Sequence, residues 1–121
     1  MLLGAGANVN APDGRRQTPL HFSAINGHVD MSRMLVGAGA NVNAADTDGS
    51  TPLHSAAYSG LVQGCEVLVE AGANVYIPNN YGETPLGIAK RRGDHASVAL
   101  LQQASEPLTK SAAQGAGDAD Q

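Results

Sequence analysis

The stretch that decides the fold spans residues 46–60 and reads DTDGSTPLHSAAYSG. Its Thr-Pro-Leu tripeptide at 51–53 also occurs at 18–20 and at 84–86, at successive intervals of 33 residues. An Asn-Val pair recurs with the same spacing, at 8–9, 41–42 and 74–75. Self-similarity at a fixed period of this length is typical of repeat proteins, in which each unit packs on its neighbours. The sequence therefore predicts a solenoid with a 33-residue period.

Each period predicts two antiparallel helices followed by a polar loop. The repeated Thr is expected to cap the first helix, and the Pro that follows it suits the first helical position. His21 and His54 stand three residues after this Thr, where the ring can bond back toward the cap as Glu does in a capping box. Glycines are expected to end the first helix, at 27, 60 and 93, and the second helix, at 39 and 72.

The second helix of each period is predicted to carry an apolar stripe that faces the neighbouring repeats. Its residues are Met31, Met34, Leu35 and Val36 in the first period, Val67, Leu68 and Val69 in the second, and Val98, Leu100 and Leu101 in the third. Cys65 stands in the register of Ser32 and Val98, which predicts a small core residue rather than a reactive thiol.

These residues closely resemble the ankyrin-repeat family, whose pattern residues 46–60 follow almost position by position. The resemblance covers residues 1 to about 105 and implies an all-α repeat solenoid of helix-turn-helix units joined by β-hairpin-like loops. It implies three full repeats, at 8–40, 41–73 and 74–106, preceded at 1–7 by the end of an incomplete repeat. Residues 107–121 lack apolar periodicity and are expected to form a disordered tail.

Three departures from the repeat pattern carry expectations of their own. Arg16 stands where the other periods have Gly49 and Gly82, at a turn that usually needs a positive φ, so the first loop is expected to be remodelled around Gly14. The third repeat diverges and gains polar residues, which suits a C-terminal capping repeat. The N-terminal edge has no such cap, which predicts either a fragment of a longer array or self-association through that edge.

Composition and charge argue against several classes of function. A formal net charge of −4 disfavours general binding to nucleic acid or to an anionic membrane. No cofactor and no metal are expected, because the Gly-Ala-Gly-Ala stretches end helices and the four histidines lack metal-binding spacing. Without a convergent acid, base and nucleophile the chain is not expected to be an enzyme. One cysteine and no signal peptide favour a cytoplasmic or nuclear location.

The leading hypothesis is a protein-binding module, an adaptor or scaffold, because stacked repeats form a concave surface from loop tips and first helices. The alternative is a regulatory or targeting segment of a longer enzyme, channel or transcription factor. A groove centred on Tyr58, Tyr81 and Arg91 is expected to contact an acidic or mixed polar partner surface. The predicted binding residues are Arg15, Gln17, Ile25, Asn26, Thr47, Asp48, Ser50, Tyr58, Ser59, Asn80, Tyr81, Glu83, Arg91 and Arg92.

Two further features leave alternatives open. The basic run at 90–92 either complements the dipole at a helix C-terminus or serves nuclear import or nucleic-acid contact. Asn10 and Asn43 follow Val in a context that resembles the ankyrin asparagines hydroxylated by an oxygenase in animal cells. Otherwise they are turn residues that bond their own loop.

Overall fold

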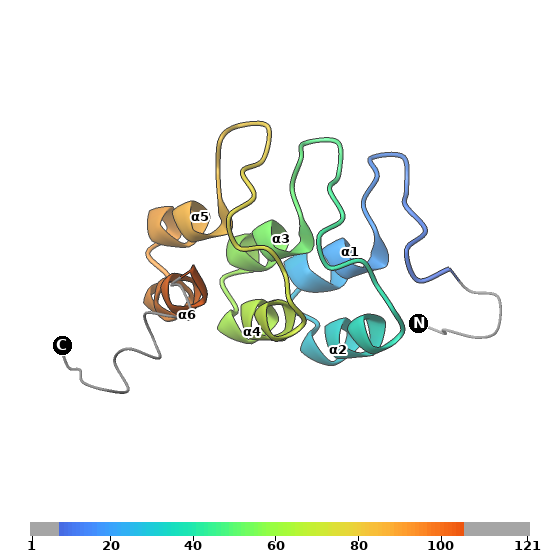
Figure 1. Ribbon diagram of the computed structural model, residues 1–121, viewed down its shortest axis with the longest axis horizontal. Helices are drawn as coiled ribbons and strands as arrows, with labels where there is room; N and C mark the ends of the chain where they lie inside the picture. The colour runs from blue at the N-terminus through green and yellow to red at the C-terminus, as the bar shows by residue number, and fades with distance from the viewer. Residues whose placement is uncertain (1–7, 106–121) are drawn as a thin grey trace.

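The computed structural model describes residues 8–105, and this range forms six helices and no strand. The helices are α1 (Pro19–Ile25), α2 (Val29–Gly37), α3 (Pro52–Ser59), α4 (Val62–Glu70), α5 (Pro85–Arg92) and α6 (His95–Ser105). In Figure 1, α1, α3 and α5 form one row above α2, α4 and α6, and the three long loops project beyond the upper row. Contacts between successive helices of each row join the pairs into a stack.

This arrangement confirms the all-α repeat solenoid. First helices begin at Pro19, Pro52 and Pro85, in step with the 33-residue period. The boundaries of the repeats at 8–40, 41–73 and 74–106 stay a prediction. The incomplete repeat at 1–7 and the tail at 107–121 lie outside the described residues.

The histidine caps are present, and each also reaches the next loop. The amide of Thr18 donates to Nδ1 of His21 at 3.1 Å, and the amide of Thr51 donates to Nδ1 of His54 at 3.0 Å. Because Nδ1 accepts, the proton is on Nε2, which donates to the carbonyls of Ser50 and Glu83 at 2.9 and 2.8 Å. Both rings therefore tie a helix start to the following repeat. Burial is the main cause that lowers the pKa of His54 below 6.5.

The expectation of a remodelled first loop is wrong, because Arg16 adopts the left-handed conformation itself, with φ 63°. The equivalent Gly49 and Gly82 have φ of 75° and 78°. The amide of Arg16 donates to the carbonyl of Asp13 at 3.0 Å, just as the amide of Gly49 donates to that of Asp46 at 2.9 Å. The turn is thus retained, and the arginine bears the steric cost of a positive φ.

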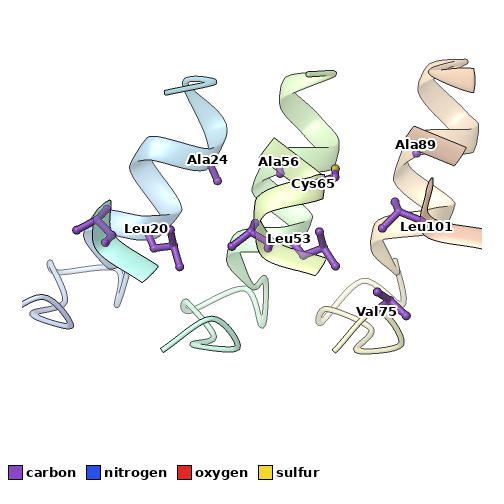
Figure 2. Packing of buried hydrophobic residues seen from close by; sticks show 10 residues of the cluster. Leu20, Ala24, Leu53, Ala56, Cys65, Val75, Ala89 and Leu101 are labelled. Carbon is purple, nitrogen blue, oxygen red and sulfur yellow. The ribbon is translucent and has the colours of Figure 1, made fainter. Parts of the chain in front are cut away.

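The core is a row of small and branched apolar side chains between the two rows of helices. Figure 2 shows Leu20, Leu53 and Leu101 together with Ala24, Ala56 and Ala89, all at most 1% exposed. Cys65 belongs to the same cluster, and burial raises the pKa of its thiol to about 11, so it is a core residue as predicted. Met34 is 51% exposed, so its predicted place in the packed stripe is wrong.

The tips of the three loops are held in line by hydrogen bonds between repeats. The amide of Thr47 donates to the carbonyl of Arg15 at 3.0 Å, and the amide of Asn80 donates to the carbonyl of Asp48 at 2.8 Å. Buried or paired backbone groups of this kind fix a loop that would otherwise be mobile. In Figure 1 the three loops stand one after another beyond the upper row of helices.

Asn10 and Asn43 do not bond their own loops, which was one of the two alternatives that the sequence left open. Oδ1 of Asn10 accepts from the amide of Asn41 at 2.6 Å, and Oδ1 of Asn43 accepts from the amide of Asn74 at 2.8 Å. Each amide side chain therefore joins its loop to the next repeat and not to its own loop.

Candidate functional site

The predicted binding residues lie on the projecting loops and on α1, α3 and α5, a surface that we call the inner face. All of them are exposed or half-buried there. Two serve the local backbone instead. Ser59 donates to the carbonyl of Ala56 at 2.7 Å at the end of α3, and the side chain of Asn26 donates to the carbonyl of Phe22 at 2.9 Å at the end of α1. Arg92 lies at the last position of α5.

Tyr58, Glu83 and Arg91 form a cluster that joins the second helix pair to the third. The phenol of Tyr58 donates to Oε1 of Glu83 at 2.8 Å, and Arg91 forms an ion pair with Oε2 of the same carboxylate. Asn79 donates to Oε1 at 3.1 Å. The Glu83 side chain is only 19% exposed, so these donors replace most of its water.

The donors in this cluster favour the ionised carboxylate. Hydrogen bonds from Asn79, Arg91 and Tyr58, in that order, lower the pKa of Glu83 to about 2 from its ordinary 4.5. The same carboxylate raises the pKa of the Tyr58 phenol and the pKa of Arg91. A partner carboxylate that approaches Arg91 would consequently compete with Glu83 for the guanidinium.

A second contact joins the loop tips. The phenol of Tyr81 donates to Oδ1 of Asp48 at 3.2 Å, and the side-chain amide of Asn80 donates to the carbonyl of Thr47 at 3.1 Å. The bond to Asp48 raises the pKa of Tyr81. The Tyr81 ring remains 71% exposed, so a large amphipathic surface stands at the tip of the third loop.

A pocket of about 210 Å³ lies between α1, α3 and the loop 46–50, and we call it the Asp46 pocket. Five of the residues that line it are among the predicted binding residues, namely Gln17, Ile25, Asp48, Ser50 and Tyr58. Phe22 and Asp46 were missed. Phe22 could have been found from the sequence, because it is the one Phe of the chain and stands in a predicted first helix. In the structure it is 45% exposed. Asp46 gave no such signal, because its position is that of a turn residue.

A larger pocket of about 370 Å³ opens on the side of α1 and α2 that faces away from α3 and α4. Pro19, Phe22, Met31 and Asn26 line part of it. Pro52 and Pro85, the register equivalents of Pro19, are fully buried against a preceding helix pair. This pocket lies on the stacking side of the first helix pair and adjoins the inner face, because Gln17 and Phe22 line both this pocket and the Asp46 pocket.

Within residues 8–105, no group of three or more His, Cys, Asp and Glu side chains is placed to hold a metal ion. No helix in this described range is long and apolar enough to cross a membrane. The buried histidines are engaged in helix caps, and the thiol of Cys65 is in the core.

A family model described as ankyrin repeats (3 copies) matches residues 1–79. The match ends before α5, although the first helix there still begins with Thr84 as its cap and Pro85 at its first position. No curated protein that was compared matches the chain.

Proposed function

Because the chain belongs to the ankyrin-repeat family, whose members are generally modules of protein–protein interaction, we propose that it is an adaptor or scaffold that binds another protein on its inner face. The observation that supports this proposal is the exposure of large apolar side chains there. Phe22, Ile25 and Tyr81 are 45%, 42% and 71% exposed. Burying such side chains against a partner removes apolar surface from water and stabilises a complex.

The second-helix row offers less apolar surface. Among the described residues, Met34 is the one large apolar side chain with comparable exposure inside α2, α4 and α6. Leu61, the N-cap of α4, is 37% exposed, and Tyr76, in the loop after α4, is 63% exposed. Its neighbour Arg33 pairs loosely with Glu70 at 3.9 Å, and both side chains are more than half exposed. Isolated apolar residues of this kind are normal on a protein surface, whereas adjoining aromatic and aliphatic groups mark contact sites.

The experiment compares two double variants that are matched in chemistry. Tyr58→Ala with Arg91→Ala removes a large side chain and an ion-paired arginine from the inner face. Met34→Ala with Arg33→Ala removes a large side chain and an ion-paired arginine from the second-helix row. A partner is first captured on the immobilised chain from extracts of the source cells and identified by mass spectrometry, and its affinity for each variant is then measured.

The inner-face variant is expected to weaken this partner by about 2 kcal/mol, or roughly 30-fold in Kd, the threshold of an interface hot spot. The matched variant should change Kd by less than about threefold. Circular dichroism must show that both variants keep their helix content. A loss of affinity confined to the Met34 and Arg33 variant would reject the inner face as the contact surface.

A further inference from the structure

The repeat register relates two neighbouring sites on the inner face. One is the cluster of Tyr58, Glu83 and Arg91, and the other is the Asp46 pocket, one helix pair earlier. In this register Asp46 replaces Asn79, Ser50 replaces Glu83 and Tyr58 replaces Arg91. The earlier site therefore has carboxylates at different positions from the later site, and it has an aromatic ring where the later site has its arginine.

The two carboxylates at the Asp46 pocket have no cation of their own in the described structure. Within residues 8–105 the ion pairs are Arg91 with Glu83 and Arg33 with Glu70. Oδ1 of Asp46 is occupied by the amides of its own turn, at 48 and 50, and Oδ2 receives only a long bond of 3.5 Å from Gln17. Asp48 accepts from the neutral phenol of Tyr81 at 3.2 Å.

The pocket also has an apolar wall. Phe22 and Ile25 contribute it from α1, both more than 40% exposed, and Tyr58 closes the side formed by α3. An arginine or lysine side chain fits such a site, because its aliphatic stem packs on apolar groups, its head group pairs with carboxylates, and aromatic faces attract a cation.

We propose that the Asp46 pocket binds an arginine or lysine side chain from a basic segment of the partner protein, with an apolar residue of the same segment against Phe22 and Ile25. This cation forms ion pairs with Asp46 and Asp48, as Arg91 does with Glu83. The inference rests on the proposed function and specifies which side chains the partner presents to the inner face. It differs from the acidic or mixed polar surface that the sequence indicates, because Arg91 is already paired with Glu83.

The test uses one substitution at two equivalent positions. Asp46→Asn removes one of the two carboxylates at the pocket, and Asp13→Asn makes the same change one period earlier, outside the pocket. Both aspartates accept from two amides of their own turn. Asn79 accepts the same bonds in the third loop, so asparagine is compatible with this turn. Helix content and urea midpoints equal to those of the wild-type chain would show that both variants keep the fold and its stability.

The probe is a library of random 12-residue peptides displayed on phage and selected on the full chain. Selected peptides are expected to carry Arg or Lys next to an apolar residue, and the synthetic peptides should bind in fluorescence anisotropy. Asp46→Asn should weaken them about tenfold, and Asp13→Asn less than twofold. Replacing the basic residue of the peptide with Gln should cause the same loss on the wild-type chain and little further loss on Asp46→Asn.

Two results would overturn the proposal, and only the second of them would also contradict the proposed function. Peptides that lose affinity with the Tyr58 and Arg91 variant, yet carry no basic residue or ignore Asp46→Asn, would refute the cation site while the proposed function stands. Peptides that lose affinity only with the Met34 and Arg33 variant would contradict the inner face itself, and the cation site with it.

Discussion

The phenol of Tyr58 at the end of α3 donates a hydrogen bond of 2.8 Å to the carboxylate of Glu83, which lies just before α5. The two residues belong to different helix pairs, so this bond and the ion pair of Glu83 with Arg91 connect neighbouring units of the stack. A repeat protein is stabilised mainly through such interfaces between adjacent units. The cluster therefore contributes to the stability of the solenoid as well as to the inner face.

The first prediction concerns Glu83→Gln. The folded-state pKa of Glu83 is lowered to about 2 from 4.5, so its contribution to stability is full above pH 4.5 and is lost as the pH falls toward 2. The variant should unfold at a lower urea concentration than the wild-type chain at pH 7, and the difference should disappear near pH 2. Urea titrations at pH 7, 4 and 2 would measure it.

Glu70→Gln is the matched control, because Glu70 forms the more exposed ion pair, at 3.9 Å, with both side chains more than half exposed. Exposed ion pairs contribute little to stability. Its urea midpoint should stay close to that of the wild-type chain at each pH. Equal effects of the two substitutions at pH 7 would contradict the role given to the Glu83 cluster.

The second prediction is that Gly64→Ala stabilises the chain. Gly64 lies in the first turn of α4, and an added Cβ would meet only the Cβ of Ala56, at 3.5 Å, an ordinary van der Waals contact. Alanine is favoured over glycine in helices by up to about 1 kcal/mol, so the urea midpoint should rise. Gly82→Ala should have the opposite effect through the backbone alone, because φ is 78° there and the added Cβ would meet nothing. A lower midpoint for Gly64→Ala would reject the account of α4.

The third prediction is that Arg16→Gly stabilises the chain although it removes a side chain. Arg16 is the one non-glycine residue with a positive φ in the described range. Replacing Arg16 by glycine removes a steric cost of about 1–2 kcal/mol from the folded state. Glycine also raises the conformational entropy of the unfolded chain, which offsets roughly half of this gain in the free energy of unfolding. Chemical denaturation should show a net gain of up to about 1 kcal/mol. Arg15→Gly, one position earlier, should give no gain, and equal gains at both positions would refute backbone strain as the cause.

The fold could be predicted from the sequence because the information is local and repeated. Thr-Pro at 18–19, 51–52 and 84–85 fixes each helix start, and the glycines at 27, 60 and 93 all have positive φ at the ends of first helices. The same register marked Arg16 as the position of a turn with positive φ, but it led to the wrong expectation that the loop is remodelled around Gly14. It could not show that the hydrogen bonds around Asp13 hold the turn in place with an arginine in it, because that balance depends on the whole loop.

The candidate site could be predicted only as a set of positions. Register identified Tyr58, Glu83 and Arg91 as side chains that the scaffold does not need, but not that they bind one another across a repeat boundary. Such contacts depend on side-chain rotamers, which a 33-residue period does not specify. Asp46 was not predicted because the sequence indicates only its role in the turn, where Oδ1 accepts from two backbone amides. The sequence does not show that Asp46 also lines the pocket, where Oδ2 receives one long bond from Gln17.

The central claim, that the inner face contacts the partner, is tested most directly by photo-crosslinking at single positions. The photoreactive amino acid p-benzoylphenylalanine replaces Tyr81 at a loop tip in one variant and Met34 on α2 in another, two side chains that are 71% and 51% exposed. Each variant is added to extracts of the source cells, irradiated, and analysed for covalent adducts by gel electrophoresis and mass spectrometry. The account predicts a light-dependent adduct with one protein from position 81 and none from position 34. Adducts from position 34 alone would contradict it.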